Sequence, residues 1–318
     1  MAKKRIRKPT ITQQIMQPAI EKLQKYQHDV TRKQYTKQMK LYVKFCRELF
    51  DARTFEDCKT HIQEYSDYLQ KENYSASTIH TYLASVCAVF DVNLGEISKS
   101  TRHVADYQKG RNIIYTNSDS DIRNPKWAYI VEFQKCVGIR RDELNHLTGK
   151  DFGFDESGRA CVFVRRGKGG KRQMQRILEK DVEFVRSYFT AVAPNEKVFD
   201  EKYFQNNLNF HRLRAECARE YYYEQLRRIQ ENPNYRSQLE KEIKARWYNT
   251  NKKKNGKVKP FRYEEMYGVY TLRGKNRQLA LQKGLPINYD KTALLATSLF
   301  KLSHFRNDVT VASYLLAV

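Results

Sequence analysis

The chain has 318 residues, 40% of them hydrophobic, which is enough for two ordinary globular domains. Its 59 lysines and arginines against 36 aspartates and glutamates give a formal charge of +23, which favours a polyanionic partner, with nucleic acid the leading candidate. No run of about 18 apolar residues and no dominant basic amphipathic helix is present, which argues against a membrane protein.

Residues 1–28 are basic and polar and lack the apolar core of a secretory signal. This predicts a short flexible arm on a cytoplasmic protein. The six cysteines form no C-x-x-C pair, and the seven histidines are dispersed. The pattern argues against a disulfide framework and a zinc site, so we expect reduced cysteines, no metal and no cofactor.

Three helical patterns follow between Thr31 and Val92, each with one apolar stripe at helical spacing. Thr31 is the expected cap of the first. Thr54 and Asp57 have the spacing of a capping box for the second, and the third begins near Ser75. The sequence therefore predicts a small all-helical domain over residues 29–97. Lysines and arginines on its outer faces are ordinarily a solvated surface, and only the total excess of positive charge favours DNA.

Periodicity fades over residues 98–122, which we expect to be a linker, and Pro125 marks the next ordered segment. The second domain, residues 123–318, opens with a helical stretch over 127–147. Alternating apolar residues over 159–166 and 172–178 flank the sequence GKGG and predict a hairpin with a basic tip. Helical patterns return at 206–226 and 290–305. The expected fold class is mainly α with a small β-sheet.

Four segments of this second domain combine basic residues with a terminal tyrosine. In chain order they are GIRRDELNHL, RRGKGGKRQMQRIL, HRLRAECA and LSHFRNDVTVASYLL. Each is weak alone, because one of 22 tyrosines is more often a packing residue, GKGG is more often a plain turn and does not fit a P-loop, and a lone His-x-x-Arg is more often an exposed pair. Their order after a basic helical domain is what gives them weight.

The ordered set resembles the catalytic boxes of the tyrosine recombinase (phage integrase) family, and the resemblance covers roughly residues 29–318. It implies a helical SAM-like core-binding domain followed by a mixed α/β catalytic domain. It also implies that a homotetramer binds specific recombination sites on double-stranded DNA of a mobile, prokaryotic genetic element. The strands would be exchanged through a Holliday junction, with an accessory DNA-bending or excision factor as a further partner. The catalytic residues implied are Arg140, Lys168, His211, Arg214, His304 and the nucleophile Tyr314, with Glu143 supporting Arg140.

These residue types suit the transesterification of a phosphodiester. Arg140 and Arg214 can each donate two hydrogen bonds to a phosphate and stay charged. Lys168 on a hairpin can protonate the departing 5′ oxygen, and His211 beside two arginines can favour the ionised form of Tyr314. One phosphodiester is exchanged for another, so the reaction needs neither ATP nor a metal.

The chain departs from the family pattern in three ways. Arg214 and His304 lie 90 positions apart, far more than in a compact member, so we expect an insertion around 224–285 with a helix over 236–248 and a polar loop over 249–260. The insertion is either surface decoration or an added DNA or subunit contact. His304 and Tyr314 lie ten positions apart, one more than the commonest family spacing, so the tyrosine helix must absorb an extra residue.

Only four residues follow Tyr314, so either the end is shortened or subunits communicate through other surfaces. Two other functions stay open on these residues. A type IB topoisomerase shares the same constellation but relaxes supercoils without pairing two sites. A catalytically silent DNA-binding protein would keep the fold for regulation or replication.

Overall fold

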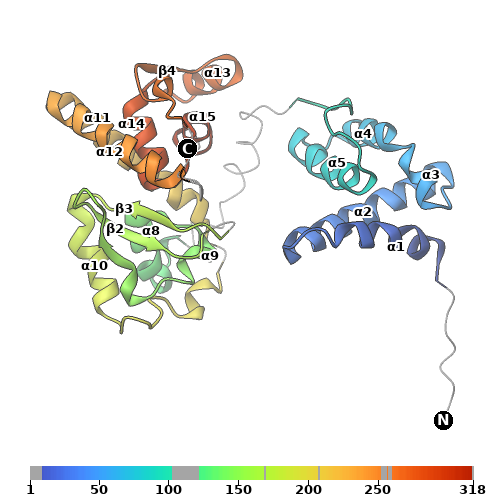
Figure 1. Ribbon diagram of the computed structural model, residues 1–318, viewed down its shortest axis with the longest axis horizontal. Coiled ribbons are helices and arrows are strands. Elements are labelled where there is room, and N and C mark those ends of the chain that lie inside the picture. The colour runs from blue at the N-terminus through green and yellow to red at the C-terminus, as the bar shows by residue number, and fades with distance from the viewer. Residues whose placement is uncertain are drawn as a thin grey trace, which may run out of the picture. The chain divides into compact units, whose positions relative to one another are not determined.

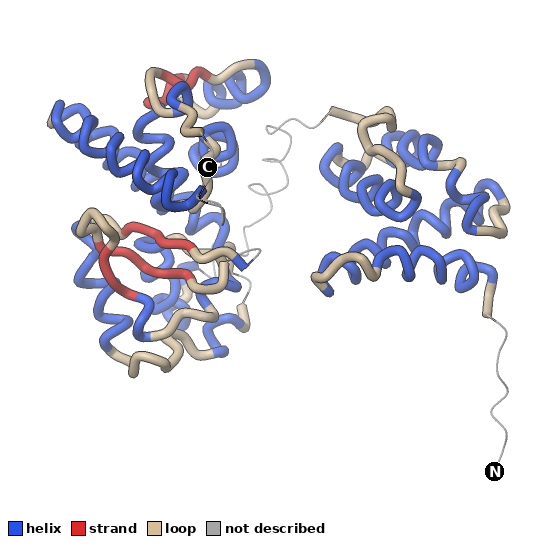
Figure 2. The backbone as a smooth tube through the Cα atoms, viewed as in Figure 1, coloured by secondary structure: helices blue, strands red, loops and turns tan. Residues whose placement is uncertain are grey.

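The computed structural model describes residues 9–101, 122–167, 170–206, 208–251, 256 and 260–316. The chain divides into two compact units, Met1–Asp106 and Tyr107–Val318 (Figure 1). Helices dominate both units, and all strands of the described residues belong to the second (Figure 2). The predicted fold class, mainly α with a small β-sheet, is confirmed.

The first unit is an assembly of helices around one apolar core. The fully buried residues Met39, Tyr42, Leu83 and Val86 lie at its centre. The predicted capping box of Thr54 and Asp57 is present. The helices are α1 (Ile11–Leu23), α2 (Asp29–Phe50), α3 (Phe55–Lys59), α4 (Ile62–Lys71) and α5 (Ala76–Phe90).

The expected flexible arm over residues 1–28 is not what the structure forms, because α1 occupies 13 of these residues. A capping box between Thr10 and Gln13 starts this helix. Ile15, Met16 and Leu23 on one of its faces are buried in the core of the unit. The basic composition of the arm concealed this apolar stripe, and burial of that stripe stabilises the helix.

Two helix boundaries in this unit also differ from expectation. The first of the three predicted helices is α2, which begins at Asp29 with His28 at its N-cap, so Thr31 lies inside the helix. The second pattern is divided between α3 and α4, because the chain turns at Thr60 and His61. Most of the predicted linker over 98–122 lies outside the described residues.

The second unit contains two sheets and a larger set of helices. A three-stranded antiparallel sheet has the order β1-β2-β3, and a two-stranded one pairs β4 with β5. The strands are β1 (Phe152–Phe154), β2 (Ala160–Val164), β3 (Gln173–Arg176), β4 (Val269–Thr271) and β5 (Asn288–Asp290). The helices are α8 (Ala128–Val137), α9 (Arg141–Leu144), α10 (Val182–Thr190), α11 (Phe210–Glu231), α12 (Pro233–Asn251), α13 (Gly274–Gln282), α14 (Lys291–Ala296) and α15 (Asn307–Thr310).

The predicted hairpin around GKGG is formed by β2 and β3, with Val164 paired to Gln173. Its tip residues Lys168 and Gly169 lie outside the described residues. The predicted helix over 127–147 is interrupted at Gly138, which takes a left-handed conformation with φ of 68° and ends α8. This break redirects the chain, so that Arg140 becomes the N-cap of the separate helix α9.

Helix α11 connects two apolar cores of this unit. Its first turns pack Phe210 and Leu213 among α8, α10 and the three-stranded sheet. Its later turns pack Tyr222 and Ile229 among α12, α13 and α14. Because α11 has 22 residues, it is about 33 Å long and can reach both cores.

The predicted helix within the insertion is confirmed as α12. Tyr235, Leu239, Ile243 and Trp247 recur every four residues along it and are buried in the second core. This helix is therefore part of the folded core and is not a surface decoration. Residues 252–255 and 257–259 of the predicted polar loop lie outside the described residues.

The helical pattern over 290–305 is confirmed only in part, because α14 continues as a π-helix, η7 (Thr297–Lys301), that ends before His304. A second π-helix, η8 (Val311–Leu315), follows α15 and contains Tyr314. The amide of Leu316 donates to the carbonyl of Val311 at 2.9 Å, which is an i to i+5 bond. A π turn holds one residue more than an α turn, so the helix is widened around Tyr314.

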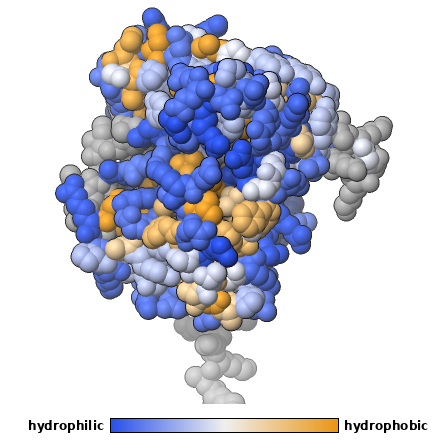
Figure 3. Space-filling model, turned by 90° about the vertical axis from the view of Figure 1, so that its left-hand side faces the viewer, coloured by the Kyte–Doolittle hydropathy of each residue, from blue (hydrophilic) through white to orange (hydrophobic). Residues whose placement is uncertain are grey.

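Hydrophilic side chains predominate on the face of the molecule shown in Figure 3, and hydrophobic ones gather near its middle. Among the described residues, no helix is both long enough and apolar enough to span a bilayer.

Candidate active site

Arg140 is held at the start of α9 by two side chains. Its Nη1 donates to Glu143 Oε1 at 2.7 Å and to Gln173 Oε1 at 3.3 Å. Glu143 is only 2% exposed, and its other oxygen accepts from the Arg140 backbone amide at 3.2 Å. A buried carboxylate thus fixes the guanidinium in place.

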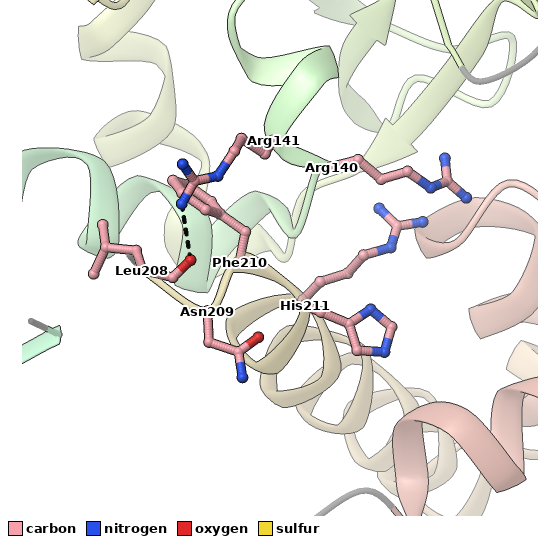
Figure 4. Close-up of a pocket in the computed structure, with 7 residues that line it drawn as sticks. Arg140, Arg141, Leu208, Asn209, Phe210 and His211 are labelled. Atoms are coloured by element: carbon pink, nitrogen blue, oxygen red, sulfur yellow. Dashed lines mark hydrogen bonds between the residues drawn. The ribbon is translucent and has the colours of Figure 1, made fainter. Parts of the chain in front are cut away.

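Arg141, the next residue, points away from this place (Figure 4). Its guanidinium donates to the carbonyls of Asn206 and Leu208 at 3.0 Å and stacks over Phe210 at 4.6 Å. Arg141 therefore anchors the loop that precedes α11. The two adjacent arginines that could be confused in the sequence have different environments.

His211 and Arg214 lie on the first turns of α11, as their spacing predicts. Arg214 is 2% exposed, and its guanidinium donates to the carbonyl of Gly138 and, at 3.0 Å, to that of Leu302. Its Nε has no hydrogen-bond partner among the described residues. Main-chain acceptors thus fix the end of this arginine, and its buried Nε remains an unused donor.

The two arginines are close enough to repel each other. Burial lowers the pKa of Arg214, the neighbouring Tyr314 opposes this shift, and the charge of Arg140 adds to it. Both arginines line a pocket of about 340 Å³, whose other wall residues are Arg141, Leu208, Asn209, Phe210 and His211. A pocket lined by three arginines favours an anion, because an anion relieves the repulsion between their positive charges.

Tyr314 lies beside this pocket. Its ring centroid is 5.4 Å from that of His211 and 6.3 Å from that of His304, and the guanidinium carbon of Arg214 lies 5.9 Å from it. The ring packs on the small side chains of Ala215 and Ala218 of α11. Small residues at these positions let η8 approach α11 closely.

His304 lies in the turn between η7 and α15 and is neutral at ordinary pH. Burial, followed by the charges of Arg214, Arg140 and Arg306, lowers its pKa to about 4. Neither ring nitrogen has a hydrogen-bond partner in the part of the chain that the structure describes. Both ring nitrogens therefore keep their hydrogen-bonding capacity.

The structure therefore brings together Arg140, Glu143, His211, Arg214, His304 and Tyr314, which come from three distant parts of the chain. The predicted site residue Lys168 lies outside the described residues. No group of three or more His, Cys, Asp or Glu side chains within the described ranges could hold a metal ion.

Sequence reasoning missed three residues that hold this site. Gln173 donates to Glu143 Oε1 at 3.0 Å. Gln175, in the amide orientation that satisfies its neighbours, accepts from Arg214 Nη1 at 3.2 Å. Lys301 is 1% exposed and donates to the carbonyls of Cys136 and Arg176 at 2.7 and 2.9 Å. The available signal was the pair of glutamines two residues apart on a predicted strand, which places both on one face.

Comparison with solved structures finds that the chain is similar to one titled "Crystal structure of XerA recombinase". The identity is 19%, the match covers 65% of this chain and 83% of the other, and the TM-score is 0.23. No family model matches the chain, and no curated protein matches it either. Function is therefore inferred from the geometry of the site.

Proposed function

We propose that the chain is a tyrosine recombinase, an enzyme that cleaves and rejoins DNA strands through a 3′-phosphotyrosine intermediate. One observation carries this proposal. The ring of Tyr314 lies next to Arg214, His211 and His304, although these residues come from α11 and from the turn after η7. A phenol surrounded by cationic and imidazole groups suits a nucleophile aimed at a phosphate.

The proposed reaction needs three operations on one phosphodiester. Arg140 and Arg214 bind the non-bridging oxygens and stabilise the charge that builds up on them. His211 accepts the phenolic proton as the oxygen of Tyr314 attacks phosphorus, and the bond to the 5′ oxygen breaks. The departing oxygen takes a proton from Lys168, and attack by a 5′ hydroxyl later reverses these steps.

The helical unit supplies a second DNA contact in this proposal. Lys33, Lys37 and Lys40 follow one exposed stripe of α2, and no acidic side chain of the described residues pairs with them. They line a groove with Ile20 and Leu23 of α1. Unpaired lysines along a groove suit the phosphates of a duplex, whose binding releases counterions and is therefore sensitive to salt.

At the level of biology, we propose that four protomers hold two DNA sites and exchange strands to integrate or excise a mobile genetic element. This part of the proposal depends on the family resemblance of the four sequence segments. An accessory DNA-bending or excision factor belongs to the same proposal.

Trapping of the covalent intermediate tests the chemistry. The protein is incubated with a pool of nicked suicide duplexes of randomised core sequence, and adducts are separated on a denaturing gel. We expect an adduct with the wild type, none with Tyr314→Phe, and a normal amount with Tyr223→Phe, which changes an exposed tyrosine of α11.

Two other results would contradict the proposal and favour a different function. DNA binding without any adduct would indicate a silent DNA-binding protein. Relaxation of supercoiled plasmid that requires Tyr314 but shows no preference for any sequence would indicate a type IB topoisomerase.

A further inference from the structure

Arg176 of β3 lies in a buried ionic cluster outside the candidate site. Its side chain is 6% exposed and forms ion pairs with Asp155 at 2.7 Å and with Glu242 at 2.5 Å. The guanidinium carbon also lies 3.5 Å from the ring centroid of Phe300 in η7. Three separate elements therefore hold one side chain of the strand.

The two carboxylates come from very different places. Asp155 lies in the turn between β1 and β2, so it belongs to the same sheet as Arg176. Glu242 lies on α12, inside the segment that the sequence analysis assigns to an insertion. Its side chain is only 9% exposed. Removing one member of a buried ionic group is costly, because the remaining charges keep their desolvation penalty.

Helix α12 gives Glu242 a fixed position. Leu239 and Ile243, which flank this residue, are completely buried in the second apolar core. Glu242 lies beside this buried face of the helix, and its carboxylate contacts Arg176 of β3. The insertion thus provides an anchored carboxylate for the sheet.

Strand β3 transmits this anchoring to the candidate site. Gln173 accepts a hydrogen bond from Arg140, and Gln175 accepts one from Arg214. Arg176 is the next residue of the same short strand, and its carbonyl accepts from the buried Lys301 at 2.9 Å. A strand that shifts or rotates moves both glutamines together, because they lie on one rigid backbone segment.

We infer that Glu242 is a positioning residue for the arginine pair, acting from the insertion through Arg176 and β3. The inference rests on the proposed function, because it concerns how well Arg140 and Arg214 are placed for a phosphate. It assigns a role to the insertion, which holds the strand that supports the site.

The test compares Glu242→Gln with the wild type in single-turnover cleavage of a duplex that the wild type cleaves. We expect cleavage to slow by about 10- to 100-fold, as small misplacements of catalytic groups do, while the Kd for the duplex changes little. Glu231→Gln is the matched control, because it removes the exposed partner of Arg227 on α11. It should cleave at the wild-type rate.

A second substrate separates positioning from general damage. A methylphosphonate at the scissile position is uncharged, so it depends much less on two placed arginines. The defect of Glu242→Gln should therefore shrink on this substrate. Equal defects on both substrates, or a wild-type rate on the phosphate, would overturn the inference.

If Glu242→Gln fails to fold, Glu242→Asp takes its place, because it keeps the charge but shortens the side chain. We expect the same difference between the phosphate and methylphosphonate substrates. Failure of the proposed function gives a different result. In that case the wild type itself forms no adduct on any duplex.

Discussion

Arg140 and Arg141 are adjacent in the chain, but their guanidinium groups point in opposite directions (Figure 4). Arg140 bonds to Glu143 and Gln173 beside the pocket, whereas Arg141 bonds to main-chain carbonyls of the loop before α11. The break at Gly138 and the N-cap position of Arg140 create this division. The two arginines should therefore differ sharply when each is replaced.

Replacement of Arg140 by alanine should abolish most cleavage but leave DNA binding nearly intact, because many other cationic side chains contact the phosphates. We expect the single-turnover rate to fall about 10²- to 10³-fold, because one stabilising donor group is lost from the transition state. Arg140→Lys keeps the charge but not the planar fork and should recover only part of the rate. Wild-type cleavage by Arg140→Ala would refute its place in the clamp.

Replacement of Arg141 by alanine should mainly lower stability. It leaves the carbonyls of Asn206 and Leu208 without their donor, so we expect the free energy of unfolding to fall by about 2–3 kcal/mol. Both tryptophans, Trp127 and Trp247, lie in the second unit, so their fluorescence in urea reports this unit alone. An unchanged unfolding midpoint would contradict the structural role.

The lysine stripe of α2 should control the salt dependence of DNA binding. Replacing Lys33, Lys37 and Lys40 by glutamine should reduce the slope of log Kd against log salt by about 3, because each phosphate contact contributes about 0.9. Fluorescence anisotropy with a labelled duplex measures this slope at several salt concentrations.

The control for this stripe is a pair of lysines that already have a partner. Lys22 and Lys25 both form ion pairs with Asp91 in the same unit. Replacing this pair by glutamine should change the slope much less. A slope that responds equally to both sets would mean that the helical unit attracts DNA only through its total charge.

Much of the fold could be predicted because local patterns and tertiary packing agree. The four-residue spacing of Leu239, Ile243 and Trp247 predicts α12, and the structure buries that same stripe. The arm before residue 28 was wrongly expected to be flexible because charge outweighed a short apolar stripe. Its burial against α2 and α5 is a tertiary effect that no local pattern reveals.

The candidate site was predictable as a set of residues but not as a geometry. Sequence spacing does not reveal that Tyr314 lies in a π-helix, η8, which packs against α11. The supports of the arginines are also partly main-chain carbonyls, such as that of Gly138, which no side-chain motif identifies. The roles of Gln173 and Glu242 follow only from the folded neighbourhood.

His304 should make the stability of the second unit depend on pH. Its pKa is lowered from 6.5 to about 4 in the folded chain, so the unfolded chain binds the proton first as the pH falls. The free energy of unfolding should therefore be unaffected by this group above about pH 6.5, fall by up to about 1.4 kcal/mol per pH unit between there and about pH 4, and level off below. Protonation of the folded imidazole is unfavourable mainly because it is buried, and also because it faces Arg214 and Arg140.

Urea unfolding followed by tryptophan fluorescence at about pH 7.5 and about pH 5 checks this expectation, with about 2 kcal/mol between the two conditions from His304 alone. His304→Asn should lose that share of the pH dependence, whereas His146→Asn, at an exposed position, should keep it. A phosphate bound between the arginines would offset their charge and raise the pKa of His304. Bound DNA should accordingly weaken the pH dependence in the wild type but not in His304→Asn, because only the wild type has a buried imidazole that feels the charges of the two arginines.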